Sequence, residues 1–217
     1  MLEKELKYEL SKENYLKLIR SLKKNPPQRS KPELAHTLKL TNYYFDDSDL
    51  RLRKRKFALR IRIVDKKLVY FTLKYPAKMP RRVPRALKVR VEHEVRIPMK
   101  VALNLLKKNK KITDVNAIPV RILQRNFSKD SLSNVHPLGR IETKRTVVPL
   151  TKTFELEIDH FQMFGNHFYE VEVETHQPKK IDKAIKELFE TYDIPYLPLT
   201  RSKFGRFIEE WKRRRDR

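Results

Sequence analysis

The sequence predicts an α+β fold: an eight-stranded antiparallel β-barrel with a charged lumen and helices packed outside it. About eight segments alternate between apolar and charged residues, which is the side-chain period of a β-strand. Other segments have the apolar period of helices, and helices could cover the apolar outer wall of a barrel. Solvated faces of an ordinary sheet would explain any one strand, so the barrel is predicted from the recurrence of the pattern.

The first half of the chain predicts one helix among five strands. Ser11 is suited to cap the helix, and Asn25-Pro26-Pro27 ends it. In the first strand, Leu2, Leu6 and Tyr8 are expected to point toward a core. The predicted elements, in order, are a strand over 2–9, the helix over 11–24, a strand over 35–46, a turn over 47–49, a short basic connection over 50–56, a hairpin of strands over 57–64 and 68–75 with its turn at 66–67, a basic loop at about 76–88, and a strand over 88–97.

The second half predicts three strands between helices. Gly165-Asn166 predicts a hairpin turn between the last two strands. The predicted order is a helix over 99–108, a mixed segment over 109–137, strands over 139–149, 153–161 and 167–175, a helix over 179–192 and a final helix over 202–212 that ends in a basic stretch.

Composition limits the chemistry that the chain can perform. With 217 residues and 39% hydrophobic residues, the chain can bury the core of one domain, predicted over 1–217. With only 3 Gly, the chain cannot form a Gly-rich phosphate-binding loop. Because it has no Cys, disulfides, zinc–thiolate sites and cysteine nucleophiles are excluded. No stretch resembles a transmembrane span, and a motif that starts at Glu3 leaves no room for a signal peptide, so we expect a cytoplasmic protein.

The charge of the chain is strongly positive. Lys and Arg number 51 against 27 Asp and Glu, which gives a formal net charge of +24. Such an imbalance favours anionic partners, namely nucleic acid, polyphosphate or an acidic surface, without choosing among them.

The charged faces of the predicted strands have both signs. In the first strand, Glu3, Glu5 and Lys7 form an E-x-E-x-K pattern whose side chains share one face. Later strands place acids or bases on the same face. The acids are Glu92, Glu94, Glu155, Glu157, Asp159, Glu170, Glu172 and Glu174, and the bases are Arg60, Arg62, Lys74, Arg90 and Arg145. Because bases bind phosphate oxygens and carboxylates bind hard divalent cations, a lumen with both signs suits a polyanion together with Mg²⁺ or Mn²⁺.

These residues also resemble a known family. In order along the chain stand E-x-E-x-K at 3–7, Tyr-Tyr-Phe-Asp at 43–46, Ala-Leu-Arg-Ile-Arg at 58–62, Thr-Leu-Lys at 72–74, Glu-His-Glu at 92–94, Lys-Arg at 144–145, Glu-Ile-Asp at 157–159, Tyr-Glu-Val-Glu at 169–172 and Ser-Lys-Phe-Gly-Arg-Phe at 202–207. This order resembles the CYTH proteins, or triphosphate tunnel metalloenzymes, which include class IV adenylate cyclases, thiamine triphosphatases, inorganic tripolyphosphatases and some RNA 5′-triphosphatases. The resemblance spans nearly the whole chain, and its pattern is most similar to bacterial members.

The resemblance implies a triphosphate tunnel and a role for each matching residue. The implied ligands of Mg²⁺ or Mn²⁺ are Glu3, Glu5, Glu92, Glu94, Asp159, Glu170 and Glu172. The implied catalytic residues, which also bind the triphosphate, are Lys7, Arg60, Arg62, Lys74, Arg145 and Lys203. Arg90 and Arg206 are expected to bind substrate only.

The expected function is metal-dependent hydrolysis of a triphosphate. Inorganic tripolyphosphate is favoured because a small basic tunnel needs no pocket for a base. The alternatives are a nucleoside triphosphatase or adenylate cyclase, an RNA 5′-triphosphatase, and a non-catalytic module that binds polyphosphate or RNA through the basic stretches 81–90 and 212–215. The expected partners are a triphosphate or polyphosphate anion, RNA at a basic surface and a second copy in a homodimer, with no membrane partner.

Overall fold

The computed structural model describes residues 1–27, 35–77, 83–150, 154–199 and 201–215. The strands in this part are β1 (Leu2–Leu10), β2 (His36–Asp46), β3 (Ala58–Val64), β4 (Leu68–Pro76), β5 (Leu87–Arg96), β6 (His136–Pro149), β7 (Glu155–Met163) and β8 (Asn166–Glu174). The helices are α1 (Lys12–Lys24), α2 (Arg51–Lys54), α3 (Met99–Leu106), the short 3₁₀ helix η2 (Ile112–Asp114), α4 (Ile118–Asn126), α5 (Lys129–Ser133), α6 (Pro178–Thr191) and α7 (Lys203–Arg215). Among the described helices, none is long and apolar enough to cross a membrane.

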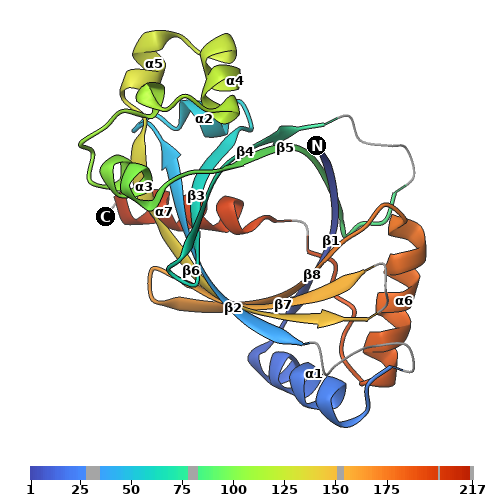
Figure 1. Ribbon diagram of the computed structural model, residues 1–217. Helices are drawn as coiled ribbons and strands as arrows, with labels where there is room; N and C mark the ends of the chain where they lie inside the picture. The colour runs from blue at the N-terminus through green and yellow to red at the C-terminus, as the bar shows by residue number, and fades with distance from the viewer. Residues whose placement is uncertain (28–34, 78–82, 151–153, 200, 216–217) are drawn as a thin grey trace. The chain divides into compact units, whose positions relative to one another are not determined.

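The strands form a closed barrel (Figure 1). They are hydrogen-bonded in the order β1-β5-β4-β3-β2-β6-β7-β8, and β8 pairs with β1. The β1–β8, β2–β3, β3–β4, β4–β5 and β7–β8 pairs are antiparallel. The predicted fold class, an eight-stranded antiparallel barrel with helices packed outside, is confirmed.

Each predicted strand and helix is present, and the differences lie in the connections. The basic connection over 50–56 contains α2, and the mixed segment over 109–137 contains η2, α4 and α5. Helices α2, η2 and α5 are too short to show a clear apolar period in the sequence. The hairpin turn lies one residue earlier than predicted, at Phe164 and Gly165. Leu2 is 45% exposed and so lies outside the core. Of the predicted basic loop at 76–88, residues 78–82 lie outside the described residues.

Contacts group the chain into two compact units. Unit 1 comprises residues 1–2, 39–77 and 90–142, and unit 2 comprises 3–38, 78–89 and 143–217. The prediction of a single domain over 1–217 remains a prediction.

In unit 2, helix α1 covers the apolar face of the β7–β8 hairpin. Tyr15 of α1 packs on Tyr169 of β8 with ring centroids 5.0 Å apart. The turn of the hairpin needs two left-handed residues, Phe164 (φ 51°) and Gly165 (φ 84°). Phe164 is held there because its ring stacks on Phe207 of α7 at 4.9 Å. The acidic residues of β7 and β8 are left on the opposite face of the hairpin.

In unit 1, strands β2 to β5 follow one another in antiparallel pairs. Their apolar faces, represented by Leu59, Phe71 and Leu73, join a buried core with side chains of α3 and α4 such as Leu105 and Leu123. The helices of this unit therefore cover the apolar face of its strands, and the charged side chains lie on the other face.

A buried carboxylate fixes α2 at the end of β2. Asp46 is fully buried, and its side chain accepts hydrogen bonds from the backbone N–H groups of Asp47, Leu52 and Arg53, each at 2.9 Å. Burial raises the pKa of Asp46 to about 6, while the three N–H groups favour the ionised form. The helix lies between two left-handed residues, Leu50 (φ 56°) and Lys56 (φ 63°), so these hydrogen bonds hold a strained segment in place.

We expect Asp46→Ala to lower the free energy of unfolding by about 3 kcal/mol, because it leaves buried N–H groups without an acceptor. Urea unfolding followed by circular dichroism measures the change. Asp49→Ala is the matched control and should cost less than about 0.5 kcal/mol, since the pair of Asp49 with Arg51 is exposed. Equal losses in the two variants would contradict the role given to Asp46.

Candidate functional site

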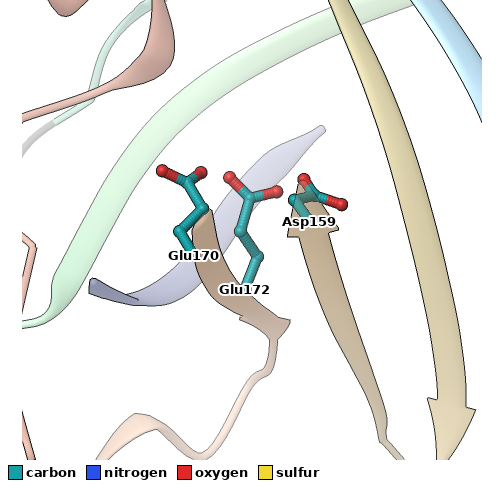
Figure 2. Close-up of side chains that lie close together, drawn as sticks. All are labelled: Asp159, Glu170 and Glu172. Carbon is teal, nitrogen blue, oxygen red and sulfur yellow. The ribbon is translucent and has the colours of Figure 1, made fainter. Parts of the chain in front are cut away.

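The candidate site lies in unit 2, on the charged face of β1, β8 and β7 and at the start of α7. The strand register places Lys7 beside Glu172 and Glu170 beside Asp159. Because side chains alternate along a strand, Glu170 and Glu172 point to the same side of β8, and Asp159 reaches the same side from β7 (Figure 2). Lys203, the first residue of α7, completes this set from a segment distant in sequence.

Three carboxylates meet at this site. Asp159, Glu170 and Glu172 each offer an oxygen atom, and these oxygens lie within 4.8 Å of one another. Asp159 and Glu170 are 0% exposed, and Glu172 is also buried. Three buried acids at such distances repel one another, so the site needs positive charge nearby.

Three cations supply that positive charge. Arg145 donates from Nε and Nη2 to the two oxygens of Asp159 at 2.8 and 2.7 Å, and from Nη2 to Glu172 at 2.5 Å. Lys203 Nζ lies 2.7 Å from Asp159, 2.6 Å from Glu170 and 3.0 Å from Glu172. Lys7 Nζ pairs with Glu172 and, at 3.1 Å, with Glu5. Each cation therefore contacts at least two carboxylates.

The ion pairs shift the pKa values of these groups in opposite directions. Burial alone would raise the pKa of Asp159 and Glu172, but the nearby cations hold both below the usual range. Burial alone would likewise lower the pKa of Lys7, Arg145 and Lys203, but the carboxylates raise all three. Five of the charged groups are thus kept ionised by one another.

Glu170 differs from the other two carboxylates. Its burial, opposed by Lys203, raises its pKa to about 7. Lys203 lies close to Oε1, yet neither oxygen of Glu170 has a hydrogen bond of good geometry within the described residues. A buried carboxylate without hydrogen bonds is costly and calls for a further cationic partner.

The donor set fits a hard divalent cation. All three converging side chains offer carboxylate oxygens, which Mg²⁺ and Mn²⁺ prefer, and no sulfur or imidazole ligand joins them in the described part of the chain. Asp159, Glu170 and Glu172 could therefore bind a metal ion, and Glu170, which is paired with Lys203, is the one whose oxygens accept no well-formed hydrogen bond in the described residues.

Six of the residues predicted from sequence come together here: Lys7, Arg145, Asp159, Glu170, Glu172 and Lys203. Glu5 lies at the edge of the site through its pair with Lys7. Glu3 is buried on β1 but is not part of the three-carboxylate group. Arg206 is also outside that group: it pairs with Glu9 at 2.8 Å and lies over the ring of Phe168.

The remaining predicted residues lie in unit 1, where Arg60, Lys74, Glu92 and Glu94 form a second charged cluster. Glu92 lies 3.1 Å from Lys74 Nζ and 3.4 Å from Arg60 Nη2. Glu94 accepts a hydrogen bond from Thr72 at 2.8 Å. Two further predicted bases lie on the charged face of the same strands: Arg62, which donates to Asn42 at 2.9 Å, and Arg90, which is half-buried on β5. In the described residues, the carboxylates of this cluster do not form a group suited to a metal, so the metal role of Glu92 and Glu94 remains a prediction.

Sequence reasoning assigned no binding or catalytic role to three residues of these clusters, although it placed Glu157 on the charged face. Glu157 pairs with Arg145, Asn42 accepts from Arg62, and Thr72 donates to Glu94. The sequence pattern could have indicated Asn42 and Thr72. Strand alternation places Asn42 on the same face of β2 as Tyr44, and Thr72 on the same face of β4 as Lys74. Neutral polar residues were not counted with the charged ones.

Several solved structures have a similar fold. HpAC1 from Hippeastrum, an adenylyl cyclase candidate described as having a dominant triphosphatase activity, superposes with a TM-score of 0.82 at 22% identity over 96% of each chain. An adenylate cyclase candidate from Bacillus halodurans gives a TM-score of 0.70 at 24% identity, covering 94% of this chain and 95% of that one. The capping enzyme triphosphatase of Mimivirus gives a TM-score of 0.52 at 9% identity, covering 88% of this chain and 89% of that one. No curated protein matches the chain in sequence.

The barrel and its charged site thus define a tunnel-type protein with the fold of adenylate cyclases and triphosphatases. Residues 1–207 match the CYTH domain, and the chain belongs to the CYTH family.

Replacing Glu170 by Gln should weaken the binding of Mn²⁺ at least tenfold, because the variant loses one of the three carboxylates that could bind the metal. Isothermal titration with Mn²⁺ measures this. Glu174→Gln is the matched control: Glu174 is an exposed acid on the same face of β8, beyond Glu172, and the variant should bind Mn²⁺ like the unchanged chain. If Glu170→Gln bound Mn²⁺ with full affinity, the metal would not lie at these carboxylates.

Proposed function

We propose that this protein hydrolyses a linear triphosphate with the help of a divalent metal ion, and that inorganic tripolyphosphate is its substrate. The observation that supports this most is the meeting of three cations, of which Lys7 and Arg145 are buried and Lys203 is partly exposed, with three buried carboxylates at one site in unit 2. A triphosphate has several negative charges, and its hydrolysis needs cations at fixed positions more than covalent chemistry.

Lys7, Arg145 and Lys203 would bind the phosphate oxygens. Lys7 and Arg145 are buried and the side chain of Lys203 is only 11% exposed, so their attraction to an anion is weakened little by water. A bidentate ion pair with Asp159 orients Arg145, so the plane of the Arg145 guanidinium is fixed before substrate binds. Fixed cations of this kind stabilise the charge that develops on the nonbridging and leaving oxygens.

Asp159, Glu170 and Glu172 would hold Mg²⁺ or Mn²⁺, with Glu3, Glu5, Glu92 and Glu94 as further predicted ligands. When bound, such an ion supplies charge neutralisation and a more acidic water molecule. The three carboxylates also keep Lys203 and Arg145 in place. The same acids would thus position both the metal and the basic residues.

The bases of unit 1 remain predicted substrate-binding residues. Arg60, Arg62, Lys74 and Arg90 lie on the charged face of β3, β4 and β5, as alternation predicts. Arg206 also remains a predicted substrate contact, although in this structure its guanidinium is held by Glu9 and Phe168.

A second candidate substrate is a nucleoside triphosphate, either hydrolysed or cyclised. Phe161 and Phe168 stack with centroids 5.3 Å apart, and Lys203 lies 5.1 Å from the ring centroid of Phe161. A half-buried aromatic side chain such as Phe168 next to a phosphate-binding lysine could stack on a base. RNA 5′-triphosphate is the third candidate, and the net charge of +24 favours it.

A non-catalytic module that binds polyphosphate remains the alternative to an enzyme, and a homodimer and a cytoplasmic location remain predictions. Binding of tripolyphosphate without metal-dependent release of phosphate would favour the module.

We expect Lys203→Ala to lower the rate of phosphate release from tripolyphosphate by about 100- to 1000-fold, because it removes a mostly desolvated cation from the developing charge. A phosphate-release assay with Mg²⁺ or Mn²⁺ measures the rate, and circular dichroism checks the fold. Lys212→Ala, an exposed position on the same helix, is the control and should keep full activity. Unchanged turnover in a folded Lys203→Ala variant would overturn the proposal.

Phe168→Ala separates the two leading substrates. If a base stacks on Phe168, the variant should lose about 5- to 100-fold in kcat/KM for ATP, which corresponds to the 1–3 kcal/mol of one stacked base. Its kcat/KM for tripolyphosphate should stay within about twofold. The assay compares both substrates in the same preparation, with products resolved to detect cyclic AMP. Equal losses on both would show that Phe168 acts only through packing.

A further inference from the structure

We propose that unit 1 binds single-stranded RNA on a basic surface formed by α2, the residues that follow it, and the α4–α5 segment. This basic surface consists of Lys54, Arg55, Lys56, Arg125 and Lys129. It lies on helices that cover the apolar face of the strands, and none of these residues belongs to either charged cluster described above. The inference therefore does not depend on the proposed hydrolysis.

Two basic segments without acids supply the charge. Residues 50–56 read Leu-Arg-Leu-Arg-Lys-Arg-Lys, and residues 115–129 contain three bases and no Asp or Glu. Arg51 is paired with Asp47 and Asp49, which precede the first segment. By contrast, Lys54, Lys56, Arg125 and Lys129 are exposed and form no ion pair with any residue in the described ranges. Four exposed bases without carboxylate partners favour an anionic ligand.

Contacts of Arg55 bring the two segments together. Its Nη1 donates to the backbone oxygen of Asn126 at the end of α4. Its guanidinium lies 4.5 Å from the ring centroid of Phe127. Arg125 precedes these two residues and Lys129 follows them, so α2 and α4 contribute to one surface, and Figure 1 shows the two helices side by side.

The basic surface has a fixed geometry because hydrogen bonds to the Asp46 side chain hold α2 in place. The three hydrogen bonds to the carboxylate of Asp46 and the left-handed residues Leu50 and Lys56 fix the direction of this short helix. Bases in fixed positions lose little conformational entropy when they bind a ligand. This favours the surface over the basic end of α7, where Arg213 and Arg214 are already paired with Glu210 at 3.0 and 3.1 Å.

A row of aromatic rings leads away from the basic surface. Phe127 contacts Phe57 at 5.3 Å, Phe57 stacks on Tyr75 at 5.2 Å, and Tyr75 stacks on His93 at 5.9 Å with an angle of 8° between the rings. His93 ends the row and is half-buried, and a hydrogen bond of 3.2 Å to the Tyr75 hydroxyl holds its ring. A flat, fixed ring at the end of a stack is suited to contact a base.

The combination of bases and rings selects single-stranded RNA among polyanions. Proteins that bind single strands combine a positive track for the backbone with aromatic rings on which bases stack. Inorganic polyphosphate and anionic lipid headgroups have no bases and would make no use of His93. The surface would therefore give the enzyme a site where an RNA strand is held by backbone charge and by one or more bases.

The test measures binding of a 5′-hydroxyl single-stranded RNA of about 12 nucleotides, a length within the site sizes of such proteins. Fluorescence anisotropy of the labelled RNA is recorded over a series of salt concentrations. The 5′-hydroxyl end removes any triphosphate, so that failure of this proposal and failure of the proposed hydrolysis are distinguishable. Phosphate release from tripolyphosphate is measured in parallel and should be the same in all variants.

Two variants and a matched control decide the outcome. Lys54→Gln, Lys56→Gln and Arg125→Gln together should lower the slope of log K against log salt by about 2, since each lost phosphate contact on a single strand contributes about 0.7. His93→Ala should weaken binding of RNA at least fivefold but leave binding of inorganic polyphosphate unchanged. The control replaces Lys23, Lys179 and Lys180, three exposed lysines of unit 2, by Gln and should bind RNA within about twofold of the unchanged chain.

Three results would overturn the proposal. An equal loss of affinity in the control would mean that RNA responds only to net charge. Full RNA affinity in the triple variant would place the binding surface elsewhere. Loss of binding to vesicles of phosphatidylserine in the triple variant, with RNA binding unaffected, would assign the surface to a membrane instead.

Discussion

The mutual neutralisation of Arg145, Lys203, Asp159 and Glu172 is the interaction on which the site of this protein depends. Arg145, Asp159 and Glu172 are buried and the Lys203 side chain is nearly so, and any one of these charges alone would be costly to remove from water. Together they hold each other ionised, which is seen in the lowered pKa of the acids and the raised pKa of the bases. The charged face of β7 and β8 can remain charged because α7 brings Lys203 to it. In this way, a contact between distant segments keeps the charged groups of unit 2 ionised.

Much of the fold could be predicted because the period of two is clear in most strands. Leu59, Ile61 and Ile63 alternate with Arg60 and Arg62 without interruption, so β3 and its charged face follow directly from the sequence. The order of the strands could not be predicted, because the pairing of β1 with β8 joins the two ends of the chain. Helix α2 was missed for a different reason: its stability comes from the Asp46 carboxylate rather than from an apolar period of its own.

The candidate site was predicted in part, and the difference has a physical cause. Residues on neighbouring strands with matching alternation, such as Asp159 and Glu170, were found because the register brings them together. Glu3 and Glu92 have the same alternation but do not belong to the group of three converging carboxylates. Alternation determines the face on which a side chain lies, whereas the position along the strand and the neighbouring strand determine its partners. Asn42 and Thr72 were missed because they are neutral, yet each forms a hydrogen bond with a charged residue, Arg62 and Glu94 respectively.

A crystal structure with Mn²⁺ and a non-hydrolysable imido analogue of tripolyphosphate would test the account most directly. The account predicts that the anomalous signal of Mn²⁺ lies at Asp159, Glu170 and Glu172. It also predicts that Lys203 and Arg145 each have a phosphate oxygen within hydrogen-bonding distance. Mn²⁺ bound elsewhere, with Lys203 and Arg145 contacting only the carboxylates that they contact in this structure, would contradict the claim that these buried ion pairs form the triphosphate site.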